Sequence, residues 1–254
     1  MMNLEIKNVS SLEKIMPEMQ SNEPARNEGS VLIGEEFSYQ LAIKSNIHLH
    51  CGQQLRAEVI SDISDKVKFY NVRYVPVVFN KYYEEYDNNY ISDAPGVFPD
   101  VLEEYTDCVP VSSHQYRALW VSVKTDDVTP GVHDIKIQLK DDEGLVWGES
   151  NFKLEVIGAK LPEMDIPATQ WFHSDCIASV HGSEIGSPRH WELIDNYMKL
   201  AADNGLNMIF TPVLMIQIGK TNIFAVHVSY ETLTVLLSLT LQKKYIVLFF
   251  YLLR

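Results

Sequence analysis

Residues 135–156 read IKIQLKDDEGLVWGESNFKLEV, and this stretch decides the fold of the first part of the chain. Apolar residues occupy alternate positions in both halves: Ile135, Ile137 and Leu139 in the first, and Phe152, Leu154 and Val156 in the second. A period of two is typical of a strand with one buried face. The acidic sequence between the halves ends at Gly144, which can adopt the positive φ of a tight turn. The stretch therefore predicts a β-hairpin.

The rest of residues 1–160 shows the same period in several places. Alternating or β-branched runs occupy residues 37–43, 55–59, 67–79 and 117–123. The last run is apolar on both faces, which indicates a strand covered on both sides. Short strands separated by turn residues predict an antiparallel β-sandwich of immunoglobulin-like type over residues 1–160.

A long loop is expected within this domain at residues 80–108, which are rich in tyrosine and acidic residues. Its segment Tyr82–Tyr90 could stack on a sugar, because tyrosine combines an apolar face with a hydroxyl group. We favour packing against the following domain, since long loops beside a domain boundary are usually packed or functional.

The period of the sequence changes after a proline-containing linker that starts at residue 161. We predict a strand over residues 169–173, a loop to Ser187, a helix that starts at Pro188, and a strand over residues 206–211. We expect the apolar face of the helix to be formed by Trp191, Ile194, Met198 and Ala201. Strand, helix and strand form a βαβ unit with parallel strands. Residues 161–212 are therefore interpreted as the beginning of an incomplete (β/α)8 barrel, and the whole chain as mainly β with an α/β part.

Charge and cysteine content limit the possible partners and location. The net charge of −13 excludes the uniform positive field that nucleic-acid binding requires. Cys51, Cys108 and Cys176 are widely spaced and form no CxxC pair, so we expect free, buried thiols. Together with a charged N-terminus that lacks an apolar signal core, they indicate a cytoplasmic protein. We assign no cofactor.

Residues 213–254 form a hydrophobic tail of atypical composition. They contain four basic residues and a single acidic one, and every proline of the chain precedes them. The apolar runs in the tail are interrupted by charged residues before they reach the roughly 20 residues of a spanning helix. We therefore expect no membrane span, and interpret the tail as buried or as sequence that has lost its proper context.

Four stretches, in this order, resemble glycoside hydrolase family 123, the β-N-acetylgalactosaminidase type: residues 11–17 (SLEKIMP), 34–40 (GEEFSYQ), 94–102 (APGVFPDVL) and 169–176 (TQWFHSDC). His190-Trp191 and residues 207–212 continue the likeness, which covers about residues 4–212. Because composition and likeness change together, we expect a chain that is truncated or frameshifted after about residue 212.

The resemblance implies a β-sandwich followed by a catalytic (β/α)8 barrel that removes a terminal β-linked N-acetylgalactosamine. In that family the acetamido group of the substrate acts as the nucleophile, an Asp orients it, and the adjacent Glu is the general acid, which departs from the usual carboxylate pair. That Asp-Glu pair belongs to a later barrel strand, and no position here matches it. Asp142-Glu143 has the right residue types but lies in the predicted hairpin turn. We therefore assign no catalytic residue and leave enzymatic activity open.

Three residues at the end of the first barrel strand remain as candidate substrate-binding residues: Trp171, His173 and Asp175. Barrel enzymes bind their ligands at the carboxyl ends of the strands. Trp171 could stack on a sugar, while His173 and Asp175 could hydrogen-bond its hydroxyl groups. A metal held by His173, Asp175 and Cys176 would lack a fourth ligand at suitable spacing, so no metal is assigned.

Three functions stay open at this point. The favoured one is an inactive fragment of a glycoside hydrolase, whose only partner would be an N-acetylhexosamine-terminated glycan. The alternatives are a carbohydrate-binding β-sandwich module without catalysis, and an interaction or membrane-peripheral protein that uses the hydrophobic tail.

Overall fold

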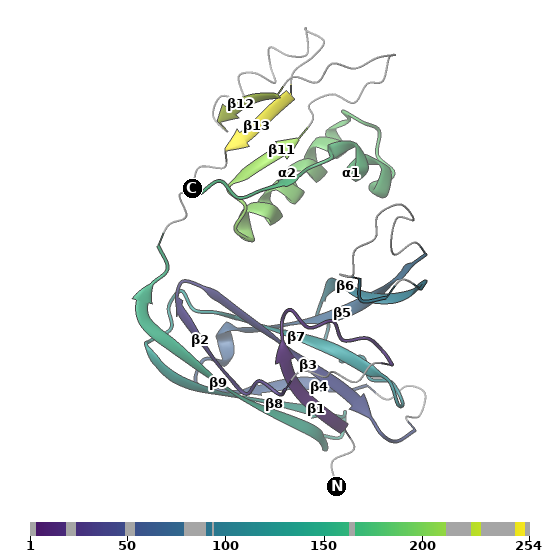
Figure 1. Ribbon diagram of the computed structural model, residues 1–254, viewed down its shortest axis with the longest axis vertical. Helices are drawn as coiled ribbons and strands as arrows, with labels where there is room; N and C mark the ends of the chain where they lie inside the picture. Colours follow the sequence, from purple (N-terminus) through teal and green to yellow (C-terminus); the bar gives the residue numbers. More distant parts are fainter. Residues whose placement is uncertain are drawn as a thin grey trace. The chain divides into compact units, whose positions relative to one another are not determined.

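The computed structural model describes residues 4–18, 24–48, 54–78, 90–92, 94–162, 166–211, 225–229 and 247–251. The chain divides into two compact units, Met1–Pro162 and Glu163–Arg254. The first unit is built of strands, and the second contains the helices α1 and α2 (Figure 1). No helix within the described ranges is both long enough and apolar enough to cross a membrane.

The first unit contains two sheets. One has five strands, all paired antiparallel, in the order β1 (Leu4–Ser10), β3 (Glu36–Ser45), β7 (Tyr116–Lys124), β5 (Val67–Val77) and β6 (Gly96–Glu104). The other has four strands in the order β2 (Glu28–Ile33), β9 (Val146–Lys160), β8 (Gly131–Lys140) and β4 (Arg56–Ile60). A short 3-10 helix, η1 (Ser64–Lys66), precedes β5. The mainly β character predicted from the sequence is confirmed.

The predicted hairpin over residues 135–156 is present as β8 and β9, which pair antiparallel. Gly144 has φ of +82° in the turn, so the conformation expected of this glycine is observed. The carboxylate of Asp141 accepts hydrogen bonds from the backbone N–H groups of Glu143 and Leu145 and from the indole of Trp147. The indole N–H contributes most to lowering the pKa of Asp141 below its usual range. Asp142-Glu143 therefore belongs to a structural turn.

One hydrophobic core draws on both sheets. It includes Leu41 and Leu119 from the five-stranded sheet and Ile137 and Leu154 from the four-stranded sheet, all fully buried. Because alternate residues of a strand share one face, the period of two in the sequence delivers these side chains to the core. Burying side chains of this size stabilises the unit by about 1.5–3 kcal/mol each.

Strand β7 is covered on both faces, as its sequence predicted. Leu119 lies in the main core, whereas Ala118 belongs to a second cluster on the opposite face together with Val9 and Ile15. The segment after β1 lies against this second face. The side-chain amide of Gln40 holds it there by donating hydrogen bonds to three of its carbonyl groups, those of Ser10, Ser11 and Glu13.

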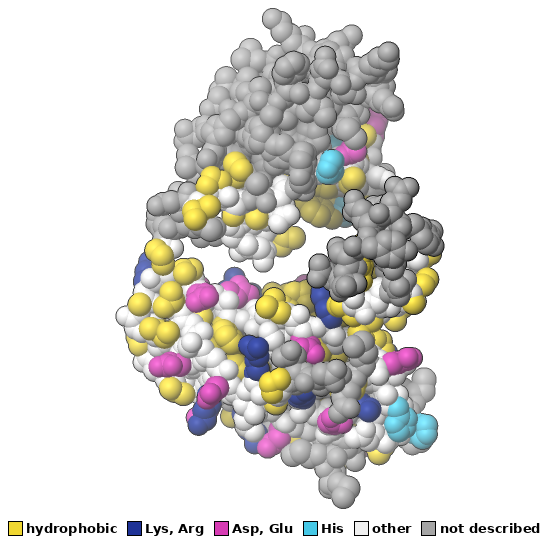
Figure 2. All heavy atoms as spheres, viewed as in Figure 1, with side chains coloured by type: hydrophobic (Ala, Val, Ile, Leu, Met, Phe, Trp, Pro, Cys, Tyr) yellow, Lys and Arg dark blue, Asp and Glu magenta, His cyan; other side chains and the backbone are white. Residues whose placement is uncertain are grey.

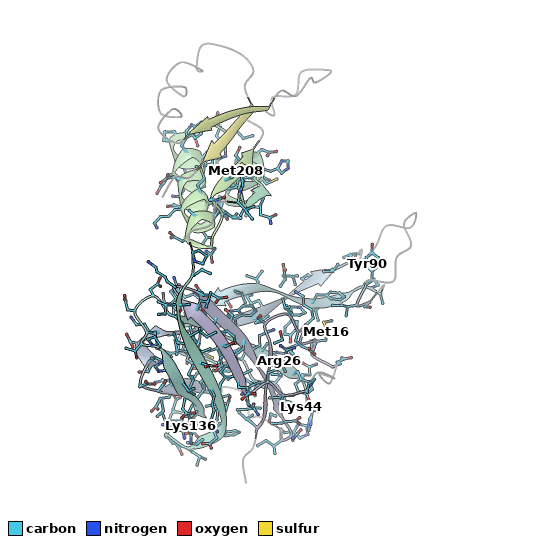
Figure 3. The ribbon with its side chains drawn as sticks, turned by 60° about the vertical axis from the view of Figure 1, so that its left-hand side comes forward. Met16, Arg26, Lys44, Tyr90, Lys136 and Met208 are labelled. Atoms are coloured by element: carbon cyan, nitrogen blue, oxygen red, sulfur yellow. The ribbon has the colours of Figure 1, made fainter. Side chains whose placement is uncertain are left out.

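Three strands of this unit were not predicted: β1, β2 and β6. Strand β6 falls within residues 80–108, where we expected a loop, and it pairs with β5 in a hairpin. Val97, Val101 and Leu102 are all exposed in this edge strand, so neither face required the alternation by which strands are recognised. Strand β2 also departs from an antiparallel arrangement, because it pairs with β9 in parallel. The Tyr82–Tyr90 segment lies outside the described residues except for Tyr90, which is partly exposed (Figure 3).

The second unit contains β10 (Thr169–Trp171), α1 (Ser174–His181), α2 (Pro188–Asp203) and β11 (Met208–Thr211). Strands β10 and β11 are parallel, as predicted. Two strands from the tail, β12 (Ala225–Ser229) and β13 (Val247–Tyr251), extend the sheet, and β13 pairs antiparallel with β11. One edge of β11 is therefore occupied by β13, whose antiparallel direction differs from that of a barrel strand.

Helix α1 lies where we expected a loop. Helix α2 begins as predicted, since the Ser187 side chain accepts a hydrogen bond from the His190 N–H and Pro188 occupies the first turn. Its predicted apolar face was partly wrong, because Trp191 is 48% exposed. The buried residues of the helix are His190, Leu193, Ile194 and Met198. His190 is buried instead of Trp191, because both ring nitrogens of His190 form hydrogen bonds with backbone groups, as described below.

Candidate functional site

The candidate site lies at the carboxyl end of β10, where the chain turns into α1. Strands β10 and β11 run parallel with Thr169 opposite Met208 and Trp171 opposite Phe210. Their carboxyl ends therefore meet at one edge of the sheet, the edge at which ligands bind in parallel α/β folds. Of the three predicted residues, the structure describes the side chains of His173 and Asp175. The side chain of Trp171 lies outside the described residues, although its backbone belongs to β10.

Asn207 fixes the approach to β10. Its side-chain oxygen accepts a hydrogen bond from the Ala168 N–H at 2.7 Å, and its amide group donates to the Ile166 carbonyl at 3.1 Å. The Met208 N–H donates to the Ala168 carbonyl. One side chain therefore aligns the residues before β10 with the start of β11. The sequence offered no signal for this role beyond an asparagine in a turn.

His173 and Asp175 lie at the first turn of α1. His173 has the extended backbone of an N-cap residue, and Asp175 follows within the first helical turn, where a negative charge is favourable. The His173 Nδ1 and Asp175 Oδ1 atoms are 4.0 Å apart, beyond direct hydrogen-bond range, and the two side chains are 45% and 31% exposed. Both side chains are thus close enough to contact one ligand and are accessible to it.

His190 connects the segments around α1 and α2 by hydrogen bonds. The sequence analysis noted this residue only as part of the family likeness and assigned it no role. Its Nε2–H donates to the Ser174 carbonyl at 2.7 Å, and its Nδ1 accepts from the Gly186 N–H at 2.9 Å. Since one ring nitrogen must donate and the other must accept, these partners select the neutral tautomer with the proton on Nε2. The buried ring thereby holds the first turn of α1 against the residues that lead into α2.

The end of α1 is also fixed by local backbone geometry. Gly182 has φ of +61°, a left-handed conformation that glycine adopts without the steric cost of a Cβ atom. The Ser183 N–H donates to the Ala178 carbonyl, which closes the helix end. The His181 Nε2 atom lies 3.0 Å from the Tyr197 hydroxyl oxygen of α2, within hydrogen-bond distance. The candidate site is therefore carried by a helix with both ends held.

We expected all three cysteines to be buried, and this expectation was wrong for Cys176. Cys176 is exposed in α1 and Cys108 is partly buried, and both are free thiols. Cys51 lies outside the described residues. Cys176 is exposed because it lies on the side of the short helix α1 opposite the buried Ile177 and Ala178.

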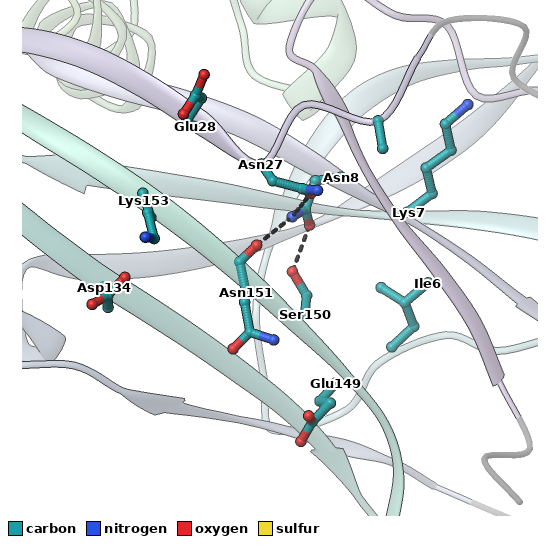
Figure 4. A pocket seen from close by; sticks show the side chains of 11 residues that line it. Ile6, Lys7, Asn8, Asn27, Glu28, Asp134, Glu149, Ser150, Asn151 and Lys153 are labelled. Atoms are coloured by element: carbon teal, nitrogen blue, oxygen red, sulfur yellow. Dashed lines mark hydrogen bonds between the residues drawn. The ribbon is translucent and has the colours of Figure 1, made fainter.

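The first unit has a groove of about 540 Å³ where β1 approaches β9 (Figure 4). Asn8 lies at its base and is hydrogen-bonded to the Asn27 side chain, the Asn151 carbonyl and the Ser150 hydroxyl. Charged side chains such as Glu28 and Lys153 form its walls, and none of the described residues that line it is aromatic. A sugar ring is usually held by stacking on an aromatic face. The groove thus gives no specific support to a carbohydrate-binding sandwich.

Comparison with known proteins identifies one family. Residues 171–233 match the sequence model of the glycoside hydrolase 123 catalytic domain. The match continues beyond residue 212, the point at which we expected the likeness to end. No curated protein sequence matches the chain.

Among solved structures, the chain is similar to a family 123 glycoside hydrolase from Clostridium perfringens, with a TM-score of 0.61 at 14% identity over 80% of this chain and 37% of that one. This chain thus spans well under two thirds of that enzyme. Other similarities are weaker. They include WR4 of C. elegans, a member of the MSP family (TM-score 0.26, 12% identity, 51% of this chain and 92% of that one). They also include the fibronectin(III)-like modules of Clostridium thermocellum CbhA (TM-score 0.27, 11% identity, 65% of this chain and 53% of that one). Residues 171–233 thus carry the sequence pattern of a glycoside hydrolase family 123 catalytic domain, and the resemblance inferred from the sequence is confirmed.

Proposed function

We propose that this chain carries the N-terminal part of a family 123 type glycoside hydrolase, with an immunoglobulin-like β-sandwich over residues 1–160 and the start of a (β/α)8 barrel over residues 161–212. The observation that carries the proposal is the coincidence of two features. The family match begins at Trp171, the last residue of β10, and β10 runs parallel to β11. Barrel enzymes bind substrate at the carboxyl ends of parallel strands, which supports the proposal. Of the two tail strands, β12 lies within the family match and β13 lies beyond it.

The proposed substrate is a glycan that ends in β-linked N-acetylgalactosamine. The Clostridium perfringens relative is described as hydrolysing glycolipid glycans, which supports a carbohydrate of this general class. His173 and Asp175 would hydrogen-bond sugar hydroxyl groups, and Trp171 would stack on the ring. An exposed imidazole and a partly exposed carboxylate suit this role, since each can exchange water for a hydroxyl partner at little cost.

We propose that this chain binds a sugar but does not cleave it. The only Asp-Glu sequence in the chain is Asp142-Glu143, and it occupies the turn between β8 and β9 in the first unit. Its Asp142 carboxylate forms an ion pair with Arg56 and is 64% exposed. A general acid must lie beside the glycosidic bond, whereas this turn belongs to the first unit and precedes the family match over residues 171–233.

The experiment has a binding arm and a turnover arm. In the binding arm, N-acetylgalactosamine is added to the purified 254-residue chain, and contact is measured by saturation-transfer NMR. We expect a signal that disappears in His173→Ala and Asp175→Ala, and that persists in the control His181→Ala, which removes an exposed histidine at the other end of α1. A signal that is equal in all variants would contradict the assigned site.

In the turnover arm, an aryl β-N-acetylgalactosaminide is incubated with the same protein. We expect no release of the aryl alcohol above the rate in buffer. Hydrolysis that copurifies with the chain and is abolished by Asp175→Ala would show that the chain has a catalytic group that this proposal denies.

A further inference from the structure

The first turn of α1 and its N-cap residue carry the two described residues of the proposed sugar site. His173 is the N-cap residue, but its side chain makes no capping hydrogen bond. Asp175 follows within the turn. The helix has eight residues, a length at which an isolated helix is marginal in water. The position of this turn therefore depends on contacts outside the helix.

His190 supplies such a contact from α2, which lies beside α1 (Figure 1). The residue is 3% exposed. Its Nε2–H donates to the Ser174 carbonyl at 2.7 Å, and its Nδ1 accepts from the Gly186 N–H at 2.9 Å. The first bond leads to the turn that carries the site, and the second leads to the loop between the two helices. The two ring nitrogens therefore hold different segments.

His190 does not contact a ligand directly. Its ring is buried, and backbone groups occupy both of its nitrogens. In contrast, the side chains of His173 and Asp175 are 45% and 31% exposed. Figure 2 shows histidine and acidic side chains at the surface of the second unit. His190 can therefore influence a bound sugar only through the residues that it holds in place.

The bond to Ser174 lies between the two site residues in the chain. Ser174 follows His173 directly, and its carbonyl belongs to the peptide bond with Asp175. His190 thus fixes the backbone between both side chains that would contact the sugar. A binding site has to be held within about 0.5 Å of its productive geometry by residues behind it. Loss of this bond would release both site residues together.

The bond to Gly186 has less influence on the site. The loop that contains Gly186 has further hydrogen bonds, including those from the Ser183 N–H to the Ala178 carbonyl and from the Ser187 N–H to the Glu184 carbonyl. These bonds remain when the bond to the His190 ring is lost. The effect of losing it should therefore stay local to the loop.

We propose that His190 is a positioning residue of the sugar site, and that it acts through the hydrogen bond from its Nε2–H to the Ser174 carbonyl. This inference rests on the proposed function, because it takes His173 and Asp175 to contact the sugar. The other interpretation is that His190 only stabilises the second unit. Stability alone depends on both ring hydrogen bonds, whereas positioning depends on the bond to Ser174.

Two substitutions separate the two hydrogen bonds. His190→Gln keeps an N–H donor where Nε2 lies and loses the acceptor at Nδ1. His190→Asn keeps an acceptor near the place of Nδ1, but its shorter side chain does not reach Ser174. Each variant loses one hydrogen bond, so a role in stability alone predicts similar behaviour of both. The control Tyr197→Phe removes the hydroxyl that lies 3.0 Å from His181 Nε2 at the other end of α1.

Binding of N-acetylgalactosamine to the full chain is measured by chemical-shift titration, and hydrogen exchange is measured without sugar. We expect His190→Asn to weaken binding by about tenfold or more, the equivalent of one lost hydrogen bond. The Cys176 amide, which donates to the His173 carbonyl, should exchange faster by a similar factor. His190→Gln and Tyr197→Phe should resemble the unchanged chain in both measurements. Thermal melting establishes that each variant is folded.

A second measurement requires no substitution. The imidazole ¹H–¹⁵N spectrum of the unchanged chain should show His190 with a protonated Nε2 and an unprotonated Nδ1, and N-acetylgalactosamine should shift the Nε2–H signal. A ring protonated on Nδ1, or a signal that does not move while the sugar binds, would overturn the inference.

The outcomes separate this inference from the proposed function. Equal binding by folded His190→Gln and His190→Asn would overturn the positioning role alone. An unchanged chain that does not bind N-acetylgalactosamine would overturn the proposed function, and this inference with it.

Discussion

The pH dependence of unfolding should reveal the pair formed by His133 and Asp62. His133 lies in β8 and is 5% exposed. Its Nδ1 is 2.7 Å from the Asp62 carboxylate, and its Nε2 is 2.9 Å from the Thr129 carbonyl. Both partners only accept hydrogen bonds, so the arrangement is complete only when both ring nitrogens carry a proton and the ring is positively charged.

The pKa directions agree with this geometry. Burial lowers the pKa of His133, but the Thr129 carbonyl and the Asp62 carboxylate raise it by more, so the folded value lies above 6.5. The hydrogen bond from His133 lowers the pKa of Asp62 below 3.8. The contribution of His133 to stability is complete below pH 6.5 and is lost as the pH rises through its raised folded pKa. The contribution of Asp62 is complete above pH 3.8 and is lost as the pH falls through its lowered folded pKa.

Asp62→Ala should therefore cost most between these limits. The Asp62 side chain is 65% exposed, so solvent screening limits the effect to about 1 kcal/mol of unfolding free energy at pH 5.5. A loss of this size lowers the melting temperature by about 2–4 °C in a domain of this length. As the pH rises through the raised pKa of His133, the ring loses its charge, and the cost should fall to about 0.3 kcal/mol.

The assay is urea unfolding of the unchanged chain and of Asp62→Ala at pH 5.5 and pH 9. A matched control, Asp134→Ala, removes the same charge from the exposed residue next to His133 in β8. We expect the control to show little dependence on pH. If Asp62→Ala were equally destabilising at both pH values, the hydrogen bond would not depend on a charged ring, and the reasoning would be refuted.

Three further changes test the packing and hydrogen bonds described above. Asn207→Ala removes two hydrogen bonds to the residues before β10 and should lower the protection of β10 amides in hydrogen exchange by about 1–3 kcal/mol, while unchanged protection would contradict its aligning role. Leu154→Ala opens a cavity at a fully buried position and should cost about 2–5 kcal/mol in urea unfolding, so a loss below 1 kcal/mol would show that the core collapses around the gap. Ser187→Ala removes the N-cap of α2 and should cost about 1 kcal/mol, and a Ser187→Asp variant that restores the lost stability would identify capping as the cause.

The strands with one buried face could be predicted from the sequence. In β8 and β9, alternate residues such as Ile137 and Leu154 are buried in the core. This burial produces the apolar period of two that is visible in the sequence. Strand β6 was missed because it exposes apolar residues on both faces, such as Val101 on one and Leu102 on the other. Its position depends on backbone pairing with β5, and pairing between strands leaves no periodic pattern when neither face is buried.

The candidate site was only partly predictable. His173 and Asp175 could be placed at the end of a strand from the change of period and the family likeness. The roles of His190 and Asn207 could not, because each acts through hydrogen bonds to backbone groups distant in sequence. A histidine beside a tryptophan gives no sign of which of the two is buried. The structure shows that the histidine is buried, since two backbone groups compensate its polar nitrogens.

The parallel pairing of β2 with β9 has a mechanical consequence. Strand β9 continues to Lys160, where it still faces Ile33 of β2, and the Leu161 N–H donates to the Ile33 carbonyl. The chain then leaves the first unit. Tension applied through this exit acts along the two strands and loads many hydrogen bonds in shear at once, instead of opening them one at a time. The first unit is thus reinforced against pulling at the point where the rest of the polypeptide is attached.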